Sequence, residues 1–202
     1  MKAVVFDFGG VMTTVTLPER ARKLAGELGL DWAGICRGYD RYRHDYDGGF
    51  MTIEEMYEKI WADEGMTVTQ EQQTRMIEED LSSFLYQNVR TLAWMRTLKE
   101  QGMKIGILTN MSAEASVLFR EHFKEFFDLA DAVVISGFEH MYKPQRQIFD
   151  LLCERIGLPA GELLFVDDVE ENCEGARRAG WQAIRFVSND QVESDFRHGL
   201  WR

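Results

Sequence analysis

Short apolar runs recur along the chain and predict the strands of a buried sheet. Each run is an almost unbroken series of Val, Ile, Leu and Phe, without the alternation of a half-exposed strand. Continuous runs of this kind are typical of parallel strands that helices cover on both faces. The runs lie at 2–7, 104–110, 132–136, 163–168 and, with a weaker pattern, 182–187.

The segments between the later runs carry the boundary signals of helices. One helix is expected from Ser112, a suitable N-cap residue, and a second over 144–157, which starts with proline and stops at glycine. A third over 169–180 has acids first and arginines last, as the helix dipole favours. This alternation predicts an α/β fold with a Rossmann-like, doubly wound parallel sheet.

The gap between the first two strands is too long for a simple connection. A strand–helix–strand unit needs roughly 30 residues. Once a crossover helix before the second strand is assigned to 89–102, residues 15–88 remain, and their pattern is helical. Thr52 and Glu55 form a capping box within them. We therefore expect 15–88 to be an inserted helical cap.

Composition excludes several classes of protein. An apolar content of 45% is ordinary for a globular chain, so disorder is not expected. The net charge of −11 argues against nucleic acid or an anionic membrane as a partner. Cys36, Cys153 and Cys173 are odd in number and widely spaced, which favours neither disulfides nor zinc. Because we find no signal peptide and no membrane span, we expect a cytoplasmic protein. We expect it to be a monomer or a homodimer.

Polar side chains follow the ends of several predicted strands. Asp7 ends the first, Thr109 and Asn110 end the second, and Asp167 and Asp168 end the fourth. Ligands of an open α/β sheet bind beyond these carboxyl ends. Three carboxylates at one edge repel one another unless a proton or a cation intervenes, and oxygen ligands in small number suit Mg²⁺.

Lys143 indicates a binding site for an anion. It directly precedes Pro144 at the start of a predicted helix, where a cation opposes the helix dipole unless an anion lies between them. Thr109, Asn110 and the amides at the start of the next helix could complete a phosphate site.

Four motifs in this order resemble those of the haloacid dehalogenase-like (HAD) hydrolase superfamily. They read "VVFDFGGV", "ILTN", "YKP" and "FVDDVEEN", and together they span Asp7 to Asn172. The insertion lies where that family places its helical C1-type cap. The resemblance implies an α/β hydrolase core formed by 1–14 and 89–202, with 15–88 as a cap of the four-helix-bundle type. The layout is similar to the bacterial α-D-glucose-1-phosphate phosphatase-like subgroup.

The resemblance also implies roles for the strand-end residues. Asp7 would be the nucleophile that takes the phosphoryl group. Thr109, and with it Asn110, would bind phosphate oxygens, and Lys143 would neutralise the charge of the nucleophile and the phosphate. The substrate would be a small phosphate ester.

The implied metal is Mg²⁺. Asp7, Asp168 and the backbone carbonyl of Gly9 would ligate it, and Asp167 would be a ligand or lie one shell out. The phosphatases of this family usually have a second Asp at the position of Gly9, which protonates the leaving group and later activates water. General acid–base assistance is worth roughly 10²–10⁴-fold in rate, so its absence must be explained.

Three functions follow from Gly9. The protein could be a phosphatase that acts on a good leaving group, such as the hemiacetal oxygen of a sugar 1-phosphate, or that takes its acid from the cap or the substrate. It could be a 2-haloacid dehalogenase, which needs neither the second Asp nor Mg²⁺, but then Asp167 and Asp168 lack a purpose. It could also be a phosphate-binding relative of low activity with a regulatory role. Sequence and chemistry together favour the phosphatase.

One stretch of the predicted cap, 37–50, mixes cations, aromatic residues and acids. It could bind the substrate, or supply the missing acid through His44 or Asp47. The pattern favours instead a solvated helix and loop whose tyrosines cover the cap interior.

Overall fold

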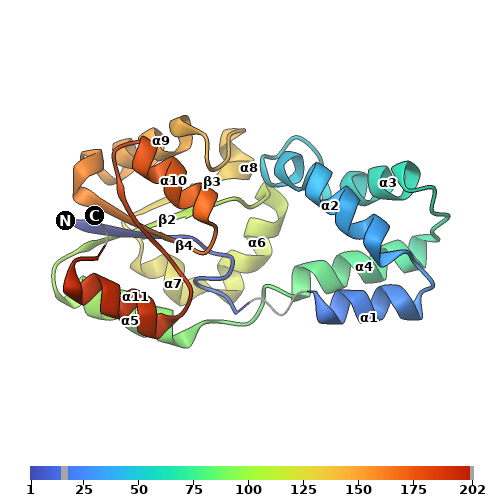
Figure 1. Cartoon of the computed structure of the whole chain (residues 1–202), viewed down its shortest axis with the longest axis horizontal. Coiled ribbons are helices and arrows are strands. Elements are labelled where there is room, and N and C mark those ends of the chain that lie inside the picture. Colours follow the sequence, from blue (N-terminus) through green and yellow to red (C-terminus); the bar gives the residue numbers. More distant parts are fainter. Residues whose placement is uncertain (15–17, 201–202) are drawn as a thin grey trace.

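A parallel sheet forms the centre of the computed structural model, which describes residues 1–14 and 18–200. Its five strands have the order β3-β2-β1-β4-β5 (Figure 1). Residues 15–17, which begin the predicted cap, and 201–202, which end the predicted core, lie outside the described residues. The α/β fold with its doubly wound sheet is thus confirmed. The strands are β1 (Ala3–Phe6), β2 (Lys104–Thr109), β3 (Ala132–Ile135), β4 (Leu163–Asp167) and β5 (Gln182–Arg185).

Helices cover both faces of this sheet, as the continuous apolar runs require. Val4 and Phe6 of β1 lie in one hydrophobic cluster, whereas Ala3 and Val5 lie in another on the opposite face. The first cluster is closed by α5 (Val89–Glu100), α6 (Ala113–His122), α7 (Lys124–Leu129) and α11 (Asn189–His198). The second is closed by α9 (Arg146–Ile156) and α10 (Glu170–Arg178).

Several helix boundaries agree with the signals in the sequence. The Ser112 hydroxyl accepts a hydrogen bond from the backbone of Ala115, as expected of an N-cap. The helix predicted from there is divided, because the chain leaves helical geometry at Phe123 between α6 and α7. Gly157 ends α9 in the left-handed conformation. Three further elements were not predicted from the sequence: α8 (Ser136–Glu139), the 3-10 turn Ala160–Glu162 and α11.

Four helices pack around a separate hydrophobic cluster beyond the carboxyl edge of the sheet (Figure 1). They are α1 (Glu19–Glu27), α2 (Trp32–Asp47), α3 (Ile53–Asp63) and α4 (Gln70–Ser82). The helical cap is therefore present, and the capping box of Thr52 and Glu55 opens α3. The interpretation of 37–50 as a solvated helix and loop was wrong in part. Helix α2 continues to Asp47, and its last residues are buried.

Contacts near the chain links and at the end of α2 help to attach the cap to the core. Where the chain passes between the core and the cap, Thr13 pairs with Gln87 in an antiparallel bridge. At the end of α2, Gly49 has a φ of +75°, and a Cβ there would lie 2.4 Å from the carbonyl oxygen of Gly137. The Ser136 hydroxyl also donates a hydrogen bond to the carbonyl of Asp47. The end of α2 is thus fixed over the edge of the sheet.

No helix of the described segments combines the length and the apolar character that a bilayer span needs.

Candidate active site

Two neighbouring strands bring three carboxylates together. Phe6 of β1 pairs with Val166 of β4, and the amide of Asp7 donates to the carbonyl of Val166 at 2.9 Å. Since both strands end at the same level, Asp7 meets Asp167 and Asp168. One oxygen from each of the three carboxylates can be chosen so that all lie within 4.8 Å of one another.

Lys143 lies between two of these acids. Its Nζ is 2.7 Å from Asp7 Oδ1 and 2.7 Å from Asp167 Oδ2, and the side chain is only 1% exposed. Asn110 fixes its backbone from both sides. The Lys143 amide donates to Asn110 Oδ1 at 2.8 Å, and Asn110 Nδ2 donates to the Lys143 carbonyl at 3.1 Å. Asn110 therefore holds the backbone of Lys143 in position.

Asp167 is fully buried and held by several donors. Besides Lys143, the amide of Val169 donates to its Oδ1 at 2.8 Å. Asn172 Nδ2 lies 3.2 Å from Oδ1 and 3.1 Å from Oδ2. These bonds engage both oxygens and hold the Asp167 carboxylate in one orientation.

Asp168 lies against Gly10, whose position no other residue could occupy without strain. Gly10 has a φ of +70°, in the left-handed region. A Cβ at this position would lie 2.3 Å from Asp168 Oδ2. The second glycine of "FDFGGV" thus permits the close approach of the Asp168 carboxylate to the loop after β1.

The charges of this cluster do not balance. Three carboxylates face one ammonium group, so the site carries a formal charge of −2 when all are ionised. Burial raises the pKa of Asp7 to about 7, with Lys143 opposing and Asp167 and Asp168 adding to the rise. Burial, together with Asp167, also raises the pKa of Asp168. A divalent cation would restore the balance, and this set of hard oxygen donors fits Mg²⁺.

A cleft of about 660 Å³ opens over the acids. The core side contributes Asp7, Lys143 and Asp168, and the cap side contributes His44, Asp47 and Phe84. Because both parts of the molecule line it, a ligand bound to the acids would touch the cap.

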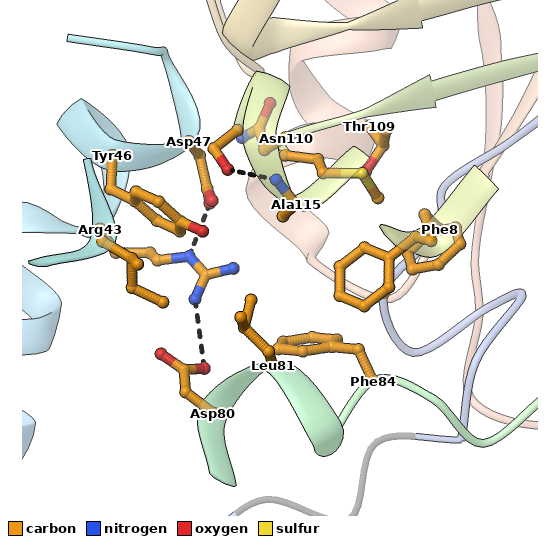
Figure 2. Close-up of a pocket in the computed structure, with 15 residues that line it drawn as sticks. Phe8, Arg43, Tyr46, Asp47, Asp80, Leu81, Phe84, Thr109, Asn110 and Ala115 are labelled. Atoms are coloured by element: carbon orange, nitrogen blue, oxygen red, sulfur yellow. Dashed lines mark hydrogen bonds and ion pairs between the residues drawn. The ribbon is translucent and has the colours of Figure 1, made fainter. Parts of the chain in front are cut away.

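A second, smaller cavity of about 30 Å³ continues from the cleft between cap and core. Gly9, Asp47, Phe84 and Asn110 line both spaces. Figure 2 shows Arg43 between Asp47 and Asp80 at this cavity, with aromatic rings on the opposite side. The inner cavity is therefore partly apolar and partly charged.

Most residues that the sequence singled out share this cleft. Asp7, Asp168, Gly9, Asn110 and Lys143 line it, and Asp167 lies directly beneath. Thr109 is 2% exposed and lines the inner cavity instead.

Arg43 and Asp80 were not predicted from the sequence. The spacing of Arg43 and Asp47, one helical turn apart, could have indicated an ion pair. Asp80 falls one turn after Met76, a buried residue of the cap cluster, so an acid on that face could have been noticed.

This fold and this site define a capped α/β enzyme with an acidic centre at the carboxyl edge of its sheet. The sequence model of the haloacid dehalogenase-like hydrolase family matches residues 1–180. The chain belongs to this family, and the enzyme is a hydrolase.

Relatives are similar over nearly the whole chain. A phosphatase of Mycobacterium tuberculosis is 25% identical over 95% of this chain and 90% of its own length. The sesquiterpene phosphatase astK of Aspergillus oryzae is 26% identical over 93% of this chain and 91% of its own. A HAD family enzyme of Bacteroides thetaiotaomicron, crystallised with magnesium and inorganic phosphate, has the same fold. Its TM-score is 0.72 at 22% identity, with 92% of this chain and 93% of that chain covered.

Proposed function

We propose that this chain is a Mg²⁺-dependent phosphatase that hydrolyses a small phosphate monoester through an aspartyl-phosphate on Asp7. The observation that carries the proposal is the cluster of Asp7, Asp167 and Asp168 around the buried Lys143 ammonium, open to a cleft under the cap. The relatives named as phosphatases support the same reaction.

Each core residue has a role in this reaction. Asp7 attacks phosphorus with one carboxylate oxygen, and the bond from phosphorus to the alcohol oxygen breaks. Lys143 offsets the charge of Asp7 and of the phosphoryl group. Thr109 and Asn110 bind phosphoryl oxygens, and Asn110 keeps Lys143 in place. Water then attacks the phosphoryl group, which frees Asp7 and releases orthophosphate.

Mg²⁺ would be held by Asp7, Asp168 and the Gly9 carbonyl. Asp167 would bind the ion either directly or through a water molecule. When bound, this ion supplies positive charge that stabilises the phosphoryl oxygens in the transition state. Asp167, through its bond to Lys143, keeps the ammonium group beside Asp7.

The favoured substrate is a sugar 1-phosphate. Its hemiacetal oxygen leaves more readily than a simple alkoxide, which suits a chain whose acid must come from the cap because Gly9 cannot supply one. In this proposal 15–88 form the cap that closes over the sugar, and 1–14 with 89–202 form the catalytic core. Both relatives are named as phosphatases, and neither name specifies a sugar, so the choice of a sugar 1-phosphate rests on the argument from Gly9.

A phosphate-release screen tests the function. Sugar 1-phosphates, sugar 6-phosphates and 2-haloacids are incubated with Mg²⁺ or with a chelator. We expect Mg²⁺-dependent phosphate release, fastest with a sugar 1-phosphate and abolished in Asp7→Asn. Asp190→Asn is the matched control, because that side chain is 84% exposed on α11, and it should retain full activity. Halide release at the same rate with and without the chelator would contradict the proposal, as would binding of phosphate without turnover of any substrate.

A further inference from the structure

The loop after β1 leaves room where a general acid would stand. Apart from its chain neighbours, a Cβ built on Gly9 meets only the ring of Phe84, at 3.7 Å, among residues 1–14 and 18–200. This space lies on the boundary of the cleft and the inner cavity, since Gly9 lines both. A phosphate ester held on Asp7 would therefore have no proton donor from this loop.

Asp47 reaches the same boundary from the cap. It also lines both spaces, and its side chain is 8% exposed. Its Oδ2 accepts a hydrogen bond from Arg43 Nε at 2.8 Å. Its Oδ1 is buried and has no hydrogen-bond partner among the described residues. A buried carboxyl oxygen without a partner is costly, and a catalytic role is one explanation for its presence in a folded protein.

The charges around Asp47 favour a shared proton. Asp47 and Asp80 are both buried and face one cation, Arg43, so the group carries one surplus negative charge. Burial raises the pKa of Asp47, while Arg43 opposes the rise and Asp80 adds to it. Tyr39 and Tyr57 donate hydrogen bonds to Asp80, which leaves Asp47 as the acid that faces the cleft.

Asp47 is also fixed relative to the core. Ser136, the first residue of α8, donates to its carbonyl, and the turn after Asp47 approaches Gly137 closely at Gly49. His44, the other cap candidate, is exposed and stacks on Tyr142 with the ring centroids 5.1 Å apart. His44 lines the cleft without reaching the inner cavity.

We propose that Asp47 is the general acid–base residue of this enzyme and replaces the carboxylate missing at Gly9. The inference rests on the proposed phosphatase function. As the bond from Asp7 to phosphorus forms, the departing alcohol oxygen takes the proton from Asp47 Oδ1. Asp47 then takes a proton from water as the water oxygen bonds to phosphorus and the bond to Asp7 breaks. Orthophosphate leaves, and Asp47 is protonated again.

The test compares leaving groups in wild type and Asp47→Asn. p-Nitrophenyl phosphate releases a stable anion that needs little protonation, whereas an alkyl phosphate releases a strongly basic alkoxide. We expect kcat for the alkyl phosphate to fall by about 10²–10⁴-fold and kcat for p-nitrophenyl phosphate to change far less. An equal fall for both substrates, or a change in KM alone, would overturn the role of Asp47.

Two further variants separate catalysis from structure. Asp80→Asn disturbs Arg43 from its other side and should affect both substrates equally. Adding Gly9→Asp to Asp47→Asn should restore the alkyl phosphate rate, because the new side chain has space beside Phe84. No restoration in a variant that melts like wild type would overturn the inference. A wild-type enzyme inactive on every phosphate ester would instead remove the proposed function, and the inference with it.

Discussion

Lys143 holds together acids that would otherwise repel one another. Its ammonium group contacts Asp7 and Asp167 at 2.7 Å each and lies 5.2 Å from the centroid of the Phe165 ring. Burial lowers its pKa, but the two acids more than offset this and raise the pKa above its usual value. Removing this charge would leave Asp7 and Asp167 buried without the cation that contacts them both.

We therefore expect Lys143→Met to destabilise the metal-free protein by about 3–5 kcal/mol, the usual cost of breaking a buried ion pair. Urea unfolding in chelator measures this change. Lys124→Met is the control, because its pair with Asp128 lies on the surface and should contribute less than about 1 kcal/mol. Equal stabilities of the two variants would contradict this role of Lys143.

Single residues differ in how far the sequence identifies them. Asp7 and Asp168 could be predicted, because a buried strand that ends in an acid places it at a known edge of the sheet. The contact between Arg43 and Asp80 could not, since it depends on how α2 and α4 pack. The amino-acid sequence alone does not predict how these two helices pack.

Helices α2 and α3 approach closely because of one glycine. A Cβ on Gly38 would lie 2.6–2.7 Å from the γ-carbons of Ile60, which is fully buried. Ile60 cannot move away without disturbing the cap cluster. The position of α2, which carries Asp47, thus depends on Gly38.

Gly38→Ala should destabilise the protein by about 1–3 kcal/mol through overpacking. Gly26→Ala should instead stabilise it by about 0.5–1 kcal/mol, because Gly26 is an exposed helix residue and a methyl group there would meet no atom within 4 Å in the described segments, apart from its chain neighbours and the backbone of its own helix. Thermal unfolding of both variants checks the pair. A stabilising Gly38→Ala would show that the two helices are not in tight contact.

The strands of the core could be predicted better than helix α2 of the cap. Each strand is a buried apolar run, which few other structures share. Helix α2 contains four charged residues and two tyrosines within 37–43, so the spacing of its apolar residues does not reveal which face is buried. The break at Phe123 was missed because apolar residues continue through it.

Without a bound cation, the cluster of Asp7, Asp167 and Asp168 lowers the free energy of unfolding of the protein. The pKa of Asp7 rises from 3.8 to about 7 on folding, chiefly through burial. A raised pKa means that the folded state holds the proton more tightly than the unfolded state. The contribution of Asp7 is thus most favourable below about pH 4 and is lost as the pH rises to about 7.

In chelator, Tm should therefore fall as the pH rises from about 5 to 7.5. A loss of ~2 kcal/mol corresponds to about 4–8 °C for a protein of this size. Mg²⁺ should remove most of the fall, and Asp7→Asn should flatten it without metal. Melting curves that Mg²⁺ leaves unchanged at pH 7.5 would contradict a cation site among these acids.

Trapping the phosphoryl group tests the central claim most directly. The enzyme is mixed with its best substrate and Mg²⁺, quenched in acid within a turnover, digested with pepsin and analysed by mass spectrometry. We predict phosphate on the peptide that contains Asp7, and none in chelator or in Asp7→Asn. Turnover that proceeds at full rate while Asp7 never carries phosphate would contradict the account.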